Sequence, residues 1–131
     1  MKVGRSVRHS LEALDCGAFE DALQHAYKAL DMTVYRRRPQ QDPRGRLATF
    51  LHEHRELYAL VVGDRRTPEA AIAGLLVVAV TDPINRTEYL PRGYRLEVGG
   101  MGELTIDVSQ WWARRDQLLQ QLRPVRDRLG A

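Results

Sequence analysis

The most apolar stretch of the chain covers residues 70–80, AAIAGLLVVAV, without a single polar side chain. A membrane-spanning helix needs about 20 such residues, so this run is interpreted as the core of a folded domain. Thr67 and Pro68 precede it, and these residue types favour the N-cap and the first position of a helix. A buried strand over residues 75–80 is the alternative, because valine is β-branched. The start signals favour the helix.

Two helices are predicted before this segment from apolar residues at helical spacing. Val7, Leu11 and Leu14 mark the first, and Gly17 is suited to end it. The second begins near Ala18, and the residues predicted for its core face are Phe19, Ala22, Leu23, Ala26, Ala29, Leu30, Thr33 and Val34. GAFEDALQHAYKALD in this region resembles the second helix of a tetratricopeptide repeat. The pattern does not recur one repeat later, so an ordinary helical hairpin is expected.

A third helix is predicted over residues 45–62 and is expected to end at Gly63. His54 falls in the middle of its core face, among Leu47, Phe50, Leu51, Leu57, Tyr58 and Val61. Between the second and third helices, residues 35–46 read YRRRPQQDPRGR, with two prolines and a glycine. This composition predicts an exposed loop of about ten residues.

The apolar pattern changes from helical to alternating after residue 93. Tyr94, Leu96 and Val98 alternate with polar residues, and so do Leu104, Ile106 and Val108 beyond a glycine-rich turn. A β-hairpin over about 93–108 is therefore predicted. Its register pairs Val98 with Leu104 and sets Arg95 opposite Asp107. A C-terminal helix is expected after it, with an apolar stripe of Trp111, Leu118, Leu122, Val125 and Leu129.

These segments predict one globular domain over residues 1–131, of the α+β class and dominated by helices. Four to five helices would pack around residues 70–80, with one antiparallel β-hairpin before the C-terminal helix. The composition of 44% apolar and 28% charged residues is ordinary for a folded domain. The single cysteine, Cys16, and the lack of an apolar signal-peptide core indicate a cytoplasmic protein that does not contact a membrane.

The formal net charge is +3, and nearly all of the positive charge is arginine. Arg36, Arg37, Arg38 and Arg44 would lie in the predicted loop and are candidates for an anion-binding site, because arginine contacts phosphate with two parallel hydrogen bonds. A solvated loop is the alternative interpretation. A GC-rich coding sequence would produce the same excess of arginine without any function.

Arg46 and His52 form a second candidate pair. Arginine followed a few residues later by histidine resembles the ribonuclease motif of the HEPN family, whose small helical proteins dimerise and cut RNA without a metal. The resemblance implies that Arg46 would stabilise the scissile phosphate and that His52 would transfer a proton. It covers seven residues, and Leu47 stands where the family has a polar residue after the arginine.

The histidines and carboxylates show no metal-binding pattern. On a helix, His52 and His54 would point about 200° apart, so no metal site is predicted, and no motif indicates a cofactor. His54 is expected to be a core histidine bonded to a backbone carbonyl or a hydroxyl. A role in a small-molecule pocket is a further alternative.

The predicted C-terminal helix carries a second stripe beside its core face: Trp112, Arg115, Leu119 and Arg126, with Arg123. Tryptophan, leucine and arginine together are typical of interface hot spots, although Trp112 packing on the hairpin is an equal alternative. The sequence thus predicts a non-enzymatic cytoplasmic interaction or assembly subunit that self-associates or docks on a larger protein. The alternative is a protein that binds or cleaves RNA.

Overall fold

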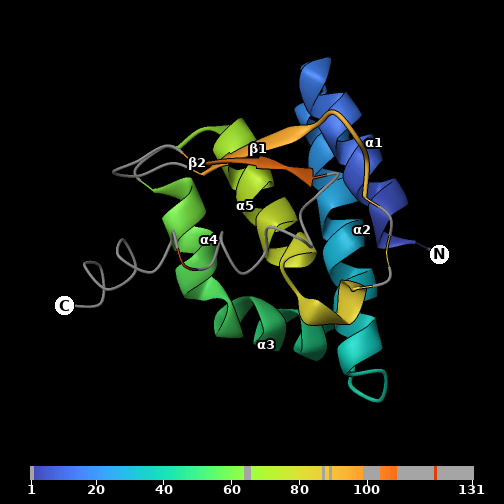
Figure 1. Ribbon diagram of the computed structural model, residues 1–131. Helices are drawn as coiled ribbons and strands as arrows, with labels where there is room; N and C mark the ends of the chain where they lie inside the picture. Colours follow the sequence, from blue (N-terminus) through green and yellow to red (C-terminus); the bar gives the residue numbers. More distant parts are fainter. Residues whose placement is uncertain are drawn as a thin grey trace.

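The computed structural model describes residues 2–63, 66–86, 88, 90–98, 104–108 and 120. The described part is dominated by helices, as predicted (Figure 1). In chain order the elements are α1 Val3–Asp15, α2 Phe19–Arg37, α3 Pro43–Glu53, α4 Arg55–Val62, α5 Pro68–Val80, a short 3₁₀ helix η1 Pro83–Asn85, β1 Arg95–Val98 and β2 Leu104–Asp107. The predicted C-terminal helix lies outside the described residues.

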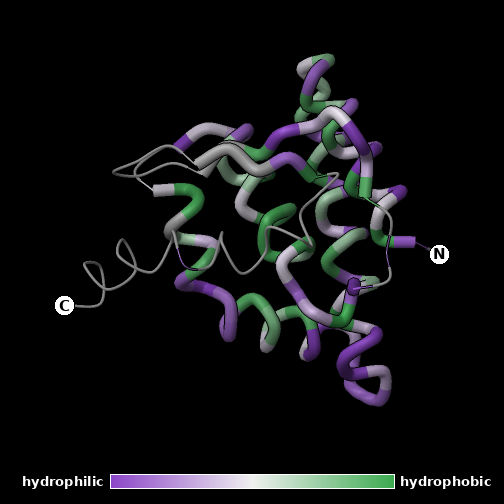
Figure 2. Tube along the Cα trace, in the orientation of Figure 1, coloured by the Kyte–Doolittle hydropathy of each residue, from purple (hydrophilic) through white to green (hydrophobic). Residues whose placement is uncertain are grey.

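The central element is α5, which packs against α2, α4 and β1 (Figure 1). Its first turn is capped, because the hydroxyl of Thr67 accepts a hydrogen bond from the backbone nitrogen of Ala70 at 3.2 Å. Every residue from Gly74 to Val80 is buried, and the tube is strongly hydrophobic along this helix (Figure 2). A helix that is apolar on all sides belongs inside a protein. The helix prediction for residues 70–80 is therefore confirmed.

The first two helices form the predicted hairpin, and Gly17 makes the turn between them. Its φ of 73° lies in the left-handed region that glycine adopts without strain. The nitrogens of Gly17 and Ala18 donate to the carbonyls of Leu14 and Ala13, the two hydrogen bonds of a Schellman motif. The hydroxyl of Ser10 also donates to the carbonyl of Ala22 at 2.7 Å, which ties α1 to α2 inside the core.

The predicted third helix is divided into two, α3 and α4, at His54. His54 has φ −106° and ψ 14°, outside helical geometry. Its Nδ1 lies 2.9 Å from the carbonyl oxygen of Phe50, which also accepts the backbone nitrogen of His54. A side chain that enters the backbone hydrogen-bond ladder is a known cause of helix kinks. The prediction of one helix over residues 45–62 was wrong, although His54 does bond a backbone carbonyl as expected.

The loop between α2 and α3 is shorter than predicted. Helix α2 continues to Arg37, and α3 begins at Pro43, where the carboxylate of Asp42 accepts a hydrogen bond from the nitrogen of Gly45 at 3.2 Å. Only residues 38–42 connect the two helices, so Arg36, Arg37, Arg44 and Arg46 belong to helices. The arginines at 36 and 37 complement the negative end of the α2 dipole, which favours the longer helix.

Strands β1 and β2 pair in an antiparallel manner with the predicted register. Val98 pairs with Leu104, Leu96 with Ile106 and Arg95 with Asp107, and the nitrogen of Val108 donates to the carbonyl of Tyr94 at 3.1 Å. The glycine-rich turn of the predicted hairpin, residues 99–103, lies outside the described residues. In the described part of the chain, no helix has the length and apolar character to cross a membrane.

Candidate protein-interaction surface

Helix α2 exposes four large apolar side chains to solvent. Phe19 and Leu23 are each 36% exposed, Tyr27 is 42% exposed and Tyr35 is 53% exposed. Among the residues whose side chains the structure describes, these four are the exposed large hydrophobic ones, and all belong to this helix. An exposed apolar patch of this kind marks a contact site more often than a scattered single residue does.

The spacing of these residues explains how they come together. Phe19, Leu23 and Tyr27 follow one another at intervals of four, so they form one continuous row of side chains, here called the α2 ridge. The row continues through Asp31 to Tyr35. Each step of four residues turns about 40° beyond a full helical turn, so the row moves away from the buried face of α2.

The ridge corrects the predicted core face of α2 and adds two tyrosines that the sequence interpretation did not single out. Phe19 and Leu23 were predicted on the core face, but the six buried residues of α2 are Ala22, Ala26, Ala29, Leu30, Thr33 and Val34. Phe19 and Leu23, in the first two turns of α2, are each 36% exposed. Tyr27 and Tyr35 were not identified as site residues. The eight-residue interval between the aromatic side chains would have revealed them, because the apolar arc of α2 is wider than one core contact requires.

A second row of polar side chains runs directly beside the α2 ridge. Glu20, Gln24 and Lys28 each follow a ridge residue by one position, and all three are exposed. The tyrosine of α4, Tyr58, lies near Tyr27 of the ridge. Partial burial raises the pKa of the Tyr58 hydroxyl, and the nearby Tyr27 hydroxyl adds to this effect. The surface therefore combines aromatic groups, an acid and a base within about three helical turns.

The predicted anion-binding arginines are engaged by acidic residues of the same chain. Arg36 donates to Asn85 at 2.9 Å and forms an ion pair with Glu88. The Nε of Arg37 donates to both oxygens of Asp82, at 2.8 and 2.7 Å, and this hydrogen bonding raises the pKa of Arg37. These contacts hold η1 and the following segment against the end of α2.

The other two members of the predicted arginine site differ in their surroundings. Arg38 is paired with Glu53 of α3, whereas Arg44 is exposed in the first turn of α3. The four arginines therefore do not converge on one open site in the described structure. Anion binding stays a prediction, and an anion would have to compete with the carboxylates that already occupy three of these side chains.

Arg46 and His52 face different surroundings although both belong to α3. Arg46 is only 8% exposed, and its guanidinium contacts Asp31 at 3.6 Å and the carbonyl of Gln41 at 3.2 Å. Its central carbon also lies 5.0 Å from the centre of the Tyr35 ring, a cation–π distance. No described residue bonds its Nε. Arg46 thus joins α3 to α2.

His52, by contrast, is exposed on the surface of α3. Its Nε2 lies 3.3 Å from the guanidinium of Arg55, and its backbone carbonyl accepts from the same group at 2.8 Å. No contact between His52 and Arg46 occurs in the described structure. The arrangement that the HEPN resemblance implies, two side chains directed at one phosphate, is therefore not preformed here.

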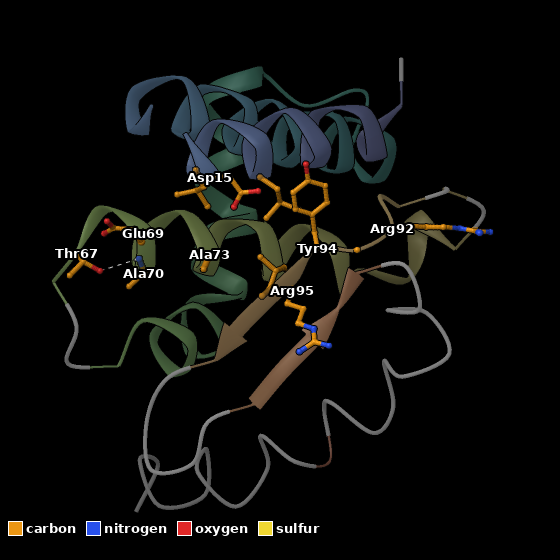
Figure 3. A pocket seen from close by; sticks show the side chains of 12 residues that line it. Asp15, Thr67, Glu69, Ala70, Ala73, Arg92, Tyr94 and Arg95 are labelled. Atoms are coloured by element: carbon orange, nitrogen blue, oxygen red, sulfur yellow. Dashed lines mark hydrogen bonds between the residues drawn. The ribbon is translucent and has the colours of Figure 1, made fainter. Parts of the chain in front are cut away.

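A groove of about 760 Å³ lies between the end of α1, the first turns of α5 and the segment that enters β1 (Figure 3). Its walls combine apolar side chains with charged ones at the rim: Leu11, Leu14, Asp15, Glu69, Tyr94 and Arg95. Partial burial, together with the charges of Glu12 and Asp15, raises the pKa of the Tyr94 hydroxyl. His54 does not line this groove, so the small-molecule interpretation that placed His54 in a pocket gains nothing from it.

The predicted interface residues Trp112, Arg115, Leu119 and Arg126 all lie outside the described residues. No protein-family model matches the chain, and no curated protein or solved structure shows significant similarity to it.

Proposed function

We propose that this protein is a small cytoplasmic interaction or assembly subunit without enzymatic activity, and that the α2 ridge is its contact surface. The observation that carries the proposal is that, in the described part of the chain, all four exposed large apolar side chains belong to α2. Three of them, Phe19, Leu23 and Tyr27, form one row. Phenylalanine and tyrosine are enriched in protein interfaces, since they bury a large area with little loss of side-chain entropy.

The polar surroundings of the ridge support the same function. Glu20, Gln24 and Lys28 would form a rim beside the apolar row, as polar residues do around the centre of an interface. The proposed cytoplasmic location is supported by the lone cysteine, Cys16, which is exposed and not part of a disulfide. The alternative, RNA binding or cleavage through Arg46 and His52, has weaker support because Arg46 is buried and paired with Asp31.

Native mass spectrometry of the protein isolated at its natural expression level tests this proposal. We expect a stoichiometric protein partner, either a second copy or a different chain, and we expect Leu23→Glu to remove it. Ala48→Glu is the matched control, because Ala48 is an exposed apolar residue on α3, away from the ridge. Circular dichroism should show that both variants are folded.

Two results would overturn the proposal. A partner that is retained by Leu23→Glu and by Tyr27→Ser would show that the α2 ridge is not the contact surface. Co-purified RNA that dissociates with a steep dependence on salt, in place of a protein, would favour the nucleic-acid alternative.

A further inference from the structure

The two exposed rows on α2 have symmetric patterns that share one centre. In the α2 ridge, an aromatic residue lies four positions before and four positions after Leu23, as Phe19 and Tyr27. In the neighbouring row, an acid and a base lie four positions before and after Gln24, as Glu20 and Lys28. The centres of the two rows are adjacent in the chain.

We infer that the ridge binds a second copy of this chain, with α2 packed antiparallel on α2 around a two-fold axis near Leu23 and Gln24. This inference rests on the proposed function and names the partner. A two-fold axis perpendicular to two antiparallel helices reverses the direction of the chain. It keeps a given row of side chains on the same side of the contact in both copies. Each row therefore meets the same row of the second copy in reverse order.

The reversed order places complementary groups opposite each other. Glu20 meets Lys28 of the second copy, and the symmetric contact joins Lys28 to Glu20. In the ridge, Leu23 meets its own copy at the axis, while Phe19 approaches the Tyr27 ring of the second copy. Opposite charges on the rim fix the register of such a contact, and aromatic pairs add to apolar burial.

The charges also favour the antiparallel over the parallel arrangement. A two-fold axis parallel to the helices would put the row of Glu20, Gln24 and Lys28 on opposite flanks in the two copies, so Glu20 would not meet Lys28 of the second copy. The parallel arrangement therefore lacks the two complementary charge pairs.

The contact is expected to be weak and dependent on concentration. Stable protein interfaces bury about 1,200–2,000 Å² in total, and a pair of three-turn helical surfaces provides less. The exposed fractions of Phe19 and Leu23, 36% each, limit the additional area that a partner can cover. We therefore expect a monomer–dimer equilibrium and not a permanent dimer.

Sedimentation equilibrium over a wide concentration range measures this equilibrium. Glu20→Lys and Lys28→Glu should each weaken dimerisation at least tenfold, since each places like charges at both symmetric contacts. The double variant should restore it to within about threefold of the wild type. Asp21→Lys is the matched control, because it reverses a charge in the same first turn of α2 but lies outside both rows. It should leave the equilibrium unchanged.

A disulfide trap locates the axis. In a Cys16→Ser background, which removes the only native cysteine, Leu23→Cys should form a covalent dimer under mild oxidation because both sulfurs lie at the two-fold axis. Asp21→Cys on the neighbouring side of the helix should form much less.

The outcomes separate this inference from the proposed function. A wild type that stays monomeric at all accessible concentrations overturns the second copy as partner, although a different protein lost from Leu23→Glu would still support the contact surface. Dimers that are insensitive to the charge exchange, or that fail to crosslink through Leu23→Cys, overturn the antiparallel α2 contact. If substitutions in the ridge change neither dimerisation nor the binding of another protein, both the antiparallel dimer and the proposed contact surface are overturned.

Discussion

The side-chain nitrogen of Asn85 lies 3.0 Å from the hydroxyl of Thr33, 52 residues earlier in the chain, and both residues are fully buried. The same nitrogen donates to the carbonyl of Ala79 at 2.9 Å, and the Asn85 oxygen accepts from Arg36 at 2.9 Å. One amide therefore joins η1 to α2 and α5. The end of α5 and the segment after it are held by polar contacts in addition to apolar packing.

Replacing Asn85 with alanine should destabilise the protein by about 1–3 kcal/mol. The change removes the donor for Thr33 and for the Ala79 carbonyl and leaves buried polar groups without a partner. The shift of the urea midpoint at constant slope measures the effect. Gln40→Ala in the exposed loop is the control and should change stability by less than about 0.5 kcal/mol.

Leu76 is fully buried in α5, and Leu76→Ala should cost about 2–5 kcal/mol through lost apolar burial and the cavity left behind. The same substitution at Leu23, which is 36% exposed, should cost clearly less. Chemical denaturation of both variants gives the comparison. Equal losses at the two sites would mean that α5 is not the centre of the core.

Gly74 allows α4 to approach α5 closely. A Cβ atom there would lie 2.9 Å from two ring carbons of Tyr58 and 3.0 Å from a methyl group of Val62. Gly74→Ala should therefore destabilise the protein by about 1–3 kcal/mol through overpacking, although alanine favours a helix by about 1 kcal/mol.

Gly45→Ala in α3 is the matched control, since the nearest atom to its added Cβ, in Gln41, is 3.6 Å away. That variant should be neutral or more stable than the wild type in thermal unfolding. A stabilised Gly74→Ala would show that Tyr58 and Val62 can move aside without cost.

Tyr58 should contribute to the loss of stability at alkaline pH. Partial burial, followed by the neighbouring Tyr27, raises the pKa of Tyr58 in the folded protein above its ordinary value of about 10. The unfolded chain therefore releases this proton first, so stability is retained below about pH 10 and falls as pH rises through the folded pKa. Urea midpoints between pH 8 and 11 should fall less steeply for Tyr58→Phe than for the wild type. Parallel profiles would contradict the prediction.

Local patterns were sufficient to predict much of the fold. Thr67, Pro68 and the apolar run after them predicted α5, because a cap and a helix start depend on residues within one turn. The alternating residues around Leu96 and Ile106 predicted the strand register, because a shift by one position would exchange the two faces of the strands. Gly17 likewise predicted the end of α1.

The surface chemistry was harder to predict. Arg36 and Arg37 were expected in an open loop, but they pair with Glu88 and Asp82, about 50 residues later in the chain. No local pattern indicates which distant carboxylate will approach an arginine, because that depends on how η1 folds back onto α2. The break at His54 also went unpredicted, since apolar periodicity continues across it. The side chain of His54 bonds the carbonyl oxygen of Phe50, and every helix has a carbonyl oxygen at the corresponding position.

The sequence by itself determined most of the helical and extended segments in the described part of the chain, although not all of their ends, because capping, glycine turns and apolar periodicity act over one or two turns of chain. Only the tertiary structure decided which side of α2 remains exposed. Phe19, Leu23 and Tyr27 have the spacing of core residues, and their exposure depends on how much of α2 is covered by α1 and α5. Several neighbouring elements cover different parts of the surface of a helix, and the sequence of the helix does not specify how closely those elements approach.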